Sequence, residues 1–314
     1  PAVGNTKILT EFDNIFSLSE AYTYRTNDAY IVTGGDVSTP IVRSLQSRLD
    51  DRVSGRSFGL TGQTSQIATA KLQTAIDQLY LNSATKGSAQ SKIVLHLEAG
   101  EYIVDGTIYI PPYATIVGAG SGKTIIRTLT ASTNIFKTVN SSSTPGIPAT
   151  DASTTSENQA TGIRLEGLTL ETTVPNKGLI LQDCKDSLFR DVEIKGPWVS
   201  GNAVATTDVG IEMNSLSGSV ETKNNIFENC RVSGYSYGIS SDWDIHNNIW
   251  DNCSVVDGSY GFAFATNLNT LNSLAGSGQE KGPYNNTITN SRFDDINRHA
   301  IWAKFGTLNT SSNN

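Results

Sequence analysis

A six-residue pattern recurs five times in the second half of the chain: apolar, two turn-forming residues, apolar, any residue, apolar. The copies are Leu165–Leu170, Phe189–Ile194, Phe227–Val232, Trp250–Val255 and Ile288–Phe293, the last with Ser at its middle apolar place. Their second turn residues are Gly167, Asp191, Asn229, Asn252 and Asn290, at spacings of 24, 38, 23 and 38 residues. Periods of this size indicate a solenoid. The short spacings suit one three-strand coil each, and the long ones suit a coil with about 15 further residues in loops. We therefore predict an all-β, single-stranded right-handed parallel β-helix.

The pattern has a physical reason. Strict alternation would point successive side chains into and out of the coil. The extra residue at the turn absorbs a phase slip, and Asn tolerates the left-handed conformation that such a corner needs. Equivalent residues then form ladders, since neighbouring coils lie about 4.8 Å apart. Asn229, Asn252 and Asn290 are expected to pass amide hydrogen bonds from coil to coil. One core stack is expected from Leu165, Phe189, Phe227, Trp250 and Ile288.

Two further sets of positions support the same repeat. A small residue followed by an apolar one comes after each corner, at Gly178-Leu179, Gly210-Ile211, Gly238-Ile239, Gly261-Phe262 and Ala300-Ile301. Asparagine pairs precede three corners, at Asn224-Asn225, Asn247-Asn248 and Asn285-Asn286. Because each coil matches at three places, chance is a poor explanation of the repeat.

Three domains are expected along the chain: residues 1–50 as a separate small segment that lacks the repeat, 51–90 as a segment with a capping helix, and 91–314 as the β-helix. Ser65–Leu81 places Ile67, Leu72, Ile76, Leu79 and Tyr80 near helical spacing, which predicts an amphipathic helix over the open N-terminal end of the solenoid. Ser141–Asn158 is rich in Ser, Thr and Pro and is expected to be a surface loop. After the last coil, either more chain follows residue 314 or a partner covers that end.

Composition excludes several classes of protein. Charged residues make up 17% of the chain and aromatic residues 8%, a balance that suits an all-β chain with many turns. The net charge of -7 argues against a nucleic-acid partner, and no apolar run is long enough to span a membrane. Neither a signal peptide nor a disulfide framework is evident in a chain with three Cys, so we expect folding in a reducing cytoplasm.

Several segments resemble the pectate-lyase-like β-helix of bacteriophage tailspikes. Asp50–Gly59 is similar to the short neck that introduces the helix in such proteins, while His96–Gly106 and Ile110–Thr124 are similar to its first coils. The Gly-Asp-Gly and paired-Asp stretch often seen after the neck is replaced here by Gly59–Thr64.

The resemblance implies a homotrimer that is made in the host cytoplasm and acts at the host cell surface as part of the virion tail. Its N-terminal segment, residues 1–50, would serve virion attachment or assembly and bind virion tail or baseplate proteins, residues 51–90 would form the neck with its capping helix, and the β-helix would face bacterial surface glycan. Neither a nucleic-acid partner nor membrane insertion is expected.

Two motifs have plain structural explanations. Gly118–Thr124 nearly matches a phosphate loop, but it is one residue short and continues as strand where a helix should begin, so we interpret it as a tight turn. Cys230 and Cys253 occupy equivalent inward positions and are interpreted as small buried apolar groups. We predict no cofactor and no metal site.

Carboxyl groups that stack in neighbouring coils are the candidates for catalysis, because glycoside hydrolysis uses two such groups on one surface. Asp257 and Asp295 each lie five residues after a corner Asn, with Asp294 beside them and His299 in the same turn. Like charges this close would raise one pKa, which allows an acid and a base to coexist. The alternative is that Asp merely caps turns, where it is common.

A second candidate cluster consists of Asp242, Trp243, Asp244 and His246. Trp198 and Trp243 are predicted to lie in loops, where an indole can stack on a sugar ring; with His299 they are the candidate substrate-binding residues. Grooves are expected at the insertions around 195–208 and 266–283. Glu228 and Asp251 also stack, next to Arg190, and are interpreted as a charge ladder.

The leading hypothesis is a phage tail protein that binds and can depolymerise host surface polysaccharide, with Asp257 and Asp295 as acid and base and Asp294, Asp242 and Asp244 as further candidates. One alternative is a non-catalytic structural or adhesive β-helix of the virion tail, which the short loops around Asp257 fit. Another is a free polysaccharide lyase, although the calcium-binding carboxylates and catalytic Arg or Lys of such enzymes are not evident in the sequence.

Overall fold

A computed structural model describes residues 52–81, 93–129, 133–215, 220–241, 244–264, 283–303 and 310–312. The chain divides into two compact units, 1–53 and 54–314. The predicted N-terminal segment, residues 1–50, lies outside the described residues, and the account below concerns the second unit.

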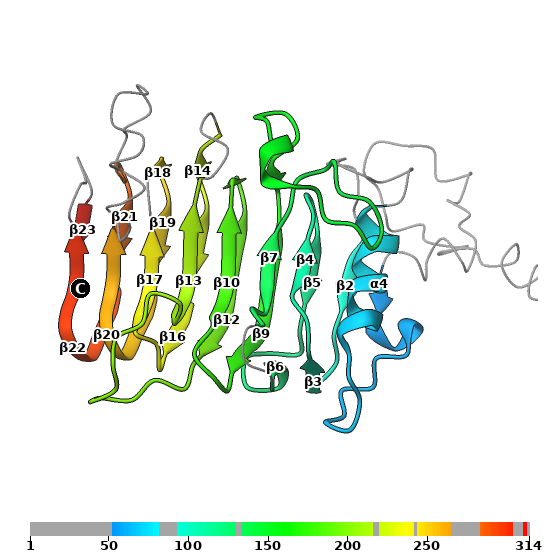
Figure 1. Cartoon of the computed structure of the whole chain (residues 1–314), viewed down its shortest axis with the longest axis horizontal. Coiled ribbons are helices and arrows are strands. Elements are labelled where there is room, and N and C mark those ends of the chain that lie inside the picture. Colours follow the sequence, from blue (N-terminus) through cyan, green and yellow to red (C-terminus); the bar gives the residue numbers. More distant parts are fainter. Residues whose placement is uncertain are drawn as a thin grey trace, which may run out of the picture. The chain divides into compact units, whose positions relative to one another are not determined.

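The second unit is a parallel β-helix built from three ladders of hydrogen-bonded strands (Figure 1). The first ladder holds β2 (Val94–His96), β5 (Thr115–Val117), the first halves of β9 (Arg164–Thr172) and β12 (Leu188–Lys195), β15 (Ile226–Glu228), β19 (Ile249–Asp251), β21 (Thr287–Thr289) and β23 (Thr310–Ser312). The second ladder holds β3 (Gly100–Val104), β6 (Thr124–Thr128), the second halves of β9 and β12, β16 (Arg231–Ser233), and the first parts of β20 (Ser254–Phe264) and β22 (Arg292–Ala303).

The third ladder holds β4 (Ile108–Ile110), β7 (Phe136–Thr138), β10 (Lys177–Gln182), β13 (Val209–Asn214), β17 (Tyr237–Ser241) and the last parts of β20 and β22. A smaller sheet closes the turn between the third ladder and the next coil, with β8 (Ala160–Thr161), β11 (Cys184–Lys185), β14 (Thr222–Lys223) and β18 (Ile245–His246). The remaining elements are β1 (Arg52–Ser54), η1 (Gly55–Phe58), α4 (Thr69–Tyr80) and η2 (Asp151–Ser153). The predicted β-helix is confirmed.

The predicted corners adopt the left-handed conformation. Gly167, Asp191, Asn229, Asn252 and Asn290 have φ angles of 63°, 52°, 54°, 52° and 50°. Gly, Asn and Asp are the residues that enter this region at least cost, which explains their recurrence at the joint between the first and second ladders.

The core stack follows the predicted register. Leu165, Phe189, Phe227, Trp250 and Ile288 pair in turn along the first ladder. The aromatic members lie face to face, with ring centroids 4.8 Å apart for Phe189 and Phe227 and 5.3 Å apart for Phe227 and Trp250. Burial of such large side chains supplies the main stabilisation of each coil.

Asparagine ladders run along two corners. On the exposed ladder, Asn252 Nδ2 donates to Asn229 Oδ1 at 2.6 Å, as predicted. The next rung differs from the prediction, because Asn290 Nδ2 donates to the Asp251 carboxylate at 2.9 Å, which accepts more strongly than a neutral amide.

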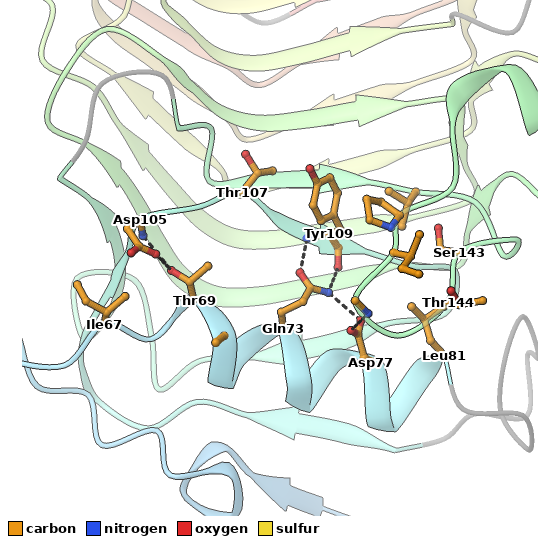
Figure 2. Close-up of a pocket in the computed structure, with 15 residues that line it drawn as sticks. Ile67, Thr69, Gln73, Asp77, Leu81, Asp105, Thr107, Tyr109, Ser143 and Thr144 are labelled. Carbon is orange, nitrogen blue, oxygen red and sulfur yellow. Dashed lines mark hydrogen bonds between the residues drawn. The ribbon is translucent and has the colours of Figure 1, made fainter.

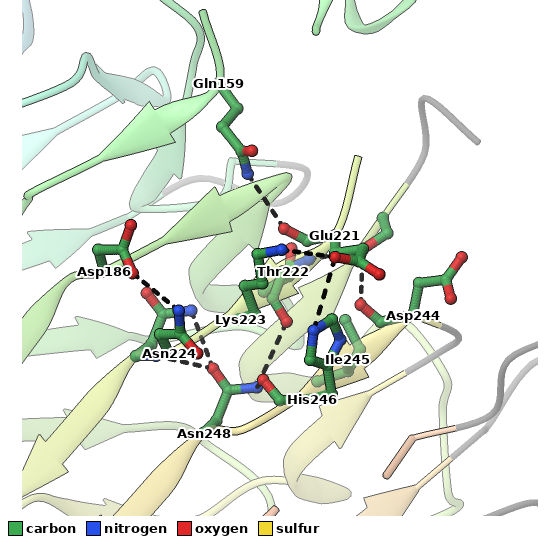
Figure 3. A network of polar contacts seen from close by, with 12 residues as sticks. Gln159, Asp186, Glu221, Thr222, Lys223, Asn224, Asp244, Ile245, His246 and Asn248 are labelled. Carbon is green, nitrogen blue, oxygen red and sulfur yellow. Dashed lines mark hydrogen bonds and ion pairs between the residues drawn. The ribbon is translucent and has the colours of Figure 1, made fainter. Parts of the chain in front are cut away.

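A second, fully buried ladder forms inside the other corner. Asn225 Nδ2 donates to Asn248 Oδ1, and Asn248 Nδ2 donates to Asn286 Oδ1, both at 3.0 Å (Figure 3 shows Asn248 in this network). The same side-chain oxygens accept the backbone N–H groups of Asn225 and Asn248, at 3.0 and 3.1 Å. The amides thus satisfy backbone groups that turn away from the sheets.

The predicted helix forms as α4 and lies at the N-terminal end of the coils (Figure 1). Leu72, Ile76, Leu79 and Tyr80 are buried, as their spacing predicts. The Tyr80 hydroxyl contacts Thr115 O at 2.6 Å and Ile93 O at 3.1 Å. Ile67 departs from the prediction: it lies before the helix, pairs as an isolated bridge with Ile103, and is 52% exposed.

Other structural interpretations are confirmed. Gly118–Lys123 forms the turn between β5 and β6, so the phosphate-loop likeness has no helix behind it. The three cysteines are free and buried. Residues 141–158 form a loop that contains η2, and its Gly146 N–H donates to Asp77 Oδ2 on α4 at 2.8 Å.

Candidate functional site

The turn between the second and third ladders carries the principal candidates. Register aligns Lys195, Ser233, Val256 and Asp294 at the end of the second ladder. The residues that follow them are Gly196, Gly234, Asp257 and Asp295. Since Val256 pairs with Asp294 and Gly258 with Ile296, the two aspartates occupy equivalent places in adjacent coils, as the sequence predicts.

Backbone conformation accounts for part of this pattern. Asp257 and Asp295 both have a φ of 52°, and Gly234 in the preceding coil has a φ of 70°. Aspartate is one of the few residues that tolerate this region, so the turn itself favours Asp at both positions. Gly196 and Gly234 lie so close that a Cβ on either would come 2.3 Å from the other's carbonyl oxygen. The equivalent turn positions of the two preceding coils therefore require glycine.

Asp257 and Asp295 open onto a groove with a volume of about 890 Å3, called here the carboxylate groove. Both side chains are exposed. The groove is further lined by polar and charged residues and by the 196–208 loop: Glu171, Lys195, Trp198, Val199, Ser200, Ser233, Ile296 and Asn297. The arrangement can offer carboxylates, an ammonium group and amides to the hydroxyl groups of a polar ligand.

Two charged residues of the groove, Glu171 and Lys195, form ion pairs with residues of the second ladder. Glu171 Oε2 accepts from Arg127 Nη2 at 3.0 Å, and Arg127 Nη1 also contacts Glu101 at 2.7 Å. Lys195 Nζ lies 3.4 Å from Glu193. Sequence reasoning missed Glu171 and Lys195 as groove residues. The signal that could have found Lys195 is its place one residue before the corner, equivalent to Asp294 beside Asp295.

The 196–208 loop forms one wall of the carboxylate groove. The backbone N–H of Trp198 donates to Gly234 O at 2.8 Å, and Asn297 Nδ2 on β22 donates to Ser200 Oγ at 3.0 Å, so the loop is bonded to two later coils. Trp198 lies in the predicted loop, but its side chain is only 5% exposed. Its ring faces are therefore covered, and stacking on a sugar would require the loop to move.

Asp294 and His299 lie beside the groove and are not part of its lining. Asp294 is half-buried and forms an ion pair with Arg292 on the same strand. His299 is exposed on the third ladder, with its ring centroid 5.8 Å from that of Tyr260. The turn thus brings Asp257 and Asp295 together and leaves these two candidates outside.

The second predicted cluster is only partly within the described residues. Asp242, Trp243 and residues 266–282 lie outside them. Asp244 is buried with a φ of 51°, and its carbonyl accepts from Thr222 N at 3.2 Å and Ser215 Oγ at 3.3 Å (Figure 3). His246 stacks on Tyr284 at 4.5 Å, and its Nε2 lies 3.5 Å from Glu221 Oε2. These contacts belong to the turn and the small sheet.

The remaining polar interpretations concern structure. Arg190 Nε donates to Glu228 at 2.7 Å, which fits the predicted charge ladder. Within the described part of the chain, no group of three or more His, Cys, Asp or Glu side chains could hold a metal ion. In the same part, no helix is long and apolar enough to cross a membrane.

A cavity that sequence reasoning missed lies between α4 and the loop at 143–148, with a volume of about 490 Å3 (Figure 2). Gln73 bridges α4 to the strand below, because its Nε2 donates to Tyr109 O at 3.1 Å and its Oε1 accepts from Tyr109 N at 2.8 Å. Gln73 Nε2 also donates to Asp77 at 2.8 Å. These bonds pair the backbone N–H and C=O of Tyr109 at the exposed edge of the first coil. We therefore assign the cavity to the packing of α4 against that coil.

Comparison with known families matches residues 53–298 to the model described as rhamnogalacturonase A/epimerase, pectate lyase-like. The chain belongs to this pectate-lyase-like family. The match spans the coils and the cap, so the resemblance found in residues 50–130 extends through the later repeats. No curated protein matches the sequence.

Several solved structures of similar fold come from phages. Tailspike protein 3 of bacteriophage CBA120 matches with a TM-score of 0.56 at 14% identity, over 100% of this chain and 48% of that one. The N-terminal fragment of bacteriophage phi29 gene product 12 matches with a TM-score of 0.52 at 15% identity, over 83% and 41%. The Dettilon tailspike protein matches with a TM-score of 0.51 at 11% identity, over 96% and 54%. The chain thus spans about half or less of the length of these structures, which it resembles in fold.

Proposed function

We propose that this chain is the β-helix of a phage tail protein of the tailspike kind, and that it binds polysaccharide on the host cell surface. The single observation that carries the proposal is the carboxylate groove, which lies on a pectate-lyase-like β-helix and has one wall made by an insertion in the repeat. Carboxylates, amides and an ammonium group are suitable partners for sugar hydroxyls. The tailspike proteins of similar fold support the location at a virion tail.

The finer proposal is that the groove cleaves the glycan, with Asp257 and Asp295 as the acid and base. Two carboxyl groups on one surface can protonate the glycosidic oxygen and either attack the sugar or activate water. Adjacent coils lie about 4.8 Å apart, which is near the separation of about 5 Å in retaining enzymes. We therefore expect retention of configuration if the pair is catalytic.

The test is incubation of the protein with a panel of purified bacterial capsular polysaccharides and lipopolysaccharides. Binding is measured on immobilised glycan, and shortening is measured by size-exclusion chromatography. We expect one glycan to bind and to shorten. Asp257→Asn and Asp295→Asn should each slow shortening at least about 100-fold, the usual scale for loss of a general acid or base.

The matched control is Asp186→Asn. Asp186 is also exposed and also has a left-handed φ, 51°, but it lies at the opposite corner, where it accepts from Asn224 Nδ2 at 3.0 Å. The control should cleave normally. Binding without shortening would favour the adhesive alternative, and unimpaired shortening by both variants would remove Asp257 and Asp295 from the chemistry. Failure of every glycan to bind would overturn the proposal itself.

A further inference from the structure

The strand β22 carries a β-bulge at the point where it leaves the carboxylate groove. Ile296 and His299 of β22 are three residues apart, whereas their partners on β20 are only two residues apart, so β22 holds one extra residue. The extra residue falls at Asn297 and Arg298. Asn297 lines the groove, and Arg298 and His299 after it are both exposed. A bulge turns a side chain in a new direction and is common beside functional sites.

Arg298 is held against a stack of aromatic rings, called here with it the Arg298 cluster. Its Nη1 donates to the Tyr260 hydroxyl at 2.9 Å, and its guanidinium carbon lies 5.6 Å from the centre of the Tyr260 ring. Tyr260 stacks on Tyr237 of the preceding coil, with ring centroids 4.9 Å apart and planes 5° apart. Its ring also contacts His299 and Trp302 of the following coil, with centroids at 5.8 and 5.4 Å. The stack therefore fixes the position of the guanidinium group.

Arg298 differs in its partner from most arginines in the described part of the chain. Six of them form an ion pair with a carboxylate: Arg56, Arg127, Arg164, Arg190, Arg231 and Arg292. Among the described residues, no carboxylate pairs with Arg298, and its hydrogen bond goes to a neutral hydroxyl instead. That bond uses one of the five N–H donors of a guanidinium group. An exposed positive charge with further donors is thus available to an anion.

Two tyrosine hydroxyls lie next to this charge. Burial raises the pKa of the Tyr237 hydroxyl, Tyr260 adds to the rise, and the Arg298 charge opposes it, so the guanidinium group acts on both members of the stack. Because the Tyr260 hydroxyl accepts from Arg298, its own proton can be donated to a further group. The cluster therefore offers a cation and hydroxyl donors on one exposed surface, a set that suits a carboxylate.

We propose that the Arg298 cluster is a subsite for the carboxylate of an acidic sugar, such as a hexuronic acid, in the glycan that occupies the carboxylate groove. The planar guanidinium group matches the two oxygens of a carboxylate, and here it can bind them without breaking an ion pair. Asp295 and Arg298 lie three residues apart on β22, at most about 10 Å along the strand, so one glycan can reach both. The inference rests on the proposed function, since it names the sugar class of that glycan.

Binding of monosaccharides tests the inference separately from the polysaccharide. Glucuronic acid and galacturonic acid are compared with glucose and galactose by NMR titration. We expect each acid to bind at least about tenfold more tightly than its parent hexose, the factor for a hydrogen bond between charged groups. The advantage should shrink at about 1 M salt, because the cluster is exposed. Glucose 6-phosphate is the third arm, and tighter binding of this sugar than of glucuronic acid would overturn the assignment to a carboxylate.

Three variants separate the contributions to this preference. Arg298→Gln should abolish the preference for acidic sugars and spare the neutral ones. Arg298→Lys keeps the charge but loses the planar pair of donors, so it should keep only part of the preference. Tyr260→Phe removes the hydroxyl that holds Arg298 and should weaken acidic sugars alone. Arg190→Gln is the matched control, because it removes the same charge from the first ladder, where Arg190 pairs with Glu228. It should bind like the wild type.

Equal binding of acidic and neutral sugars, or a preference that survives Arg298→Gln, would overturn the subsite. So would a change in the mass of Arg298→Gln by light scattering, which would assign the cluster to a contact between chains. If uronic acids bind as expected and no polysaccharide does, the subsite stands and the proposed function fails. If only neutral polysaccharides bind, the proposed function stands and the subsite fails.

Discussion

Single residues carry the strain of this fold at its corners. Each coil must turn sharply between ladders, and the left-handed conformation at Asn229 or Asn252 is the local solution. Asn contributes twice, because it tolerates the backbone and its amide can bond to the next coil. The buried corner uses Asn differently. Asn248 is not in the left-handed region, and it stabilises the corner only through the hydrogen bonds of its buried side-chain amide.

Replacing Asn248 by Ala is expected to lower the free energy of unfolding by about 2–4 kcal/mol, because it removes the acceptor of the Asn225 backbone N–H and one hydrogen bond from the side chain of each neighbouring Asn. Chemical denaturation followed by circular dichroism measures the loss. Asn252→Gly is the matched control: it keeps the left-handed corner and removes one exposed amide bond, so it should cost less than about 1 kcal/mol. Equal losses in the two variants would contradict the importance of the buried ladder.

At the scale of elements, α4 covers the strand edges of the first coil. The helix meets the first coils through buried Leu72 and Ile76 and through the polar contacts of Gln73 and Tyr80. A parallel solenoid would otherwise end in unpaired strand groups, which promote association between chains. The 196–208 loop is the other element with a distinct effect, because it creates walls for two cavities on an otherwise regular coil.

The contact of α4 with the first coils should weaken at high pH. Burial raises the pKa of the Tyr80 hydroxyl to about 12 from an ordinary value of 10.0. Since the folded-state pKa is the higher one, the contribution of Tyr80 to stability is complete below pH 10 and is lost as the pH rises from 10 to 12. The loss tends toward about 3 kcal/mol, because one pKa unit is worth about 1.4 kcal/mol.

Tyr80→Phe isolates this effect. At pH 7 the variant should be less stable by about 1 kcal/mol through loss of the hydrogen bond to Thr115. The difference between wild type and variant should shrink and then reverse above pH 10, as measured by urea denaturation at a series of pH values. A difference that stays constant up to pH 12 would show that Tyr80 does not titrate with unfolding.

At the scale of the whole molecule, one face of the β-helix is regular and partly apolar. Ile226 and Ile249 stand in register on the outside of the first ladder and are 37% and 39% exposed. Leu188 precedes them in the same column. Exposed apolar side chains that stack in one column are suited to burial against another chain. We predict that the protein is a homotrimer, and this column is our candidate for the contact between its chains.

Light scattering should therefore give three times the mass of one chain. The double variant Ile226→Asp, Ile249→Asp should shift the mass toward one chain, because it places charges in the contact. Ile147→Asp is the control: Ile147 is also exposed, but it lies in the loop over α4, so the trimer should persist. A trimeric double variant would exclude this column as the interface.

Much of this architecture was predictable from the sequence, because a solenoid repeats one local solution in every coil. Gly167, Asp191 and Asn229 recur at fixed places since only such residues turn the corner cheaply, and the stack from Leu165 to Ile288 follows from that register. Asp257 and Asp295 could be aligned by counting for the same reason.

The tertiary structure alone decided what the insertions do, since the 196–208 loop obeys no repeat. Its packing buried Trp198, where the sequence predicted an open ring, and made this residue a wall of two separate spaces. Such contacts depend on how a unique segment folds back over the coils, and the amino-acid pattern holds no period from which that path can be derived.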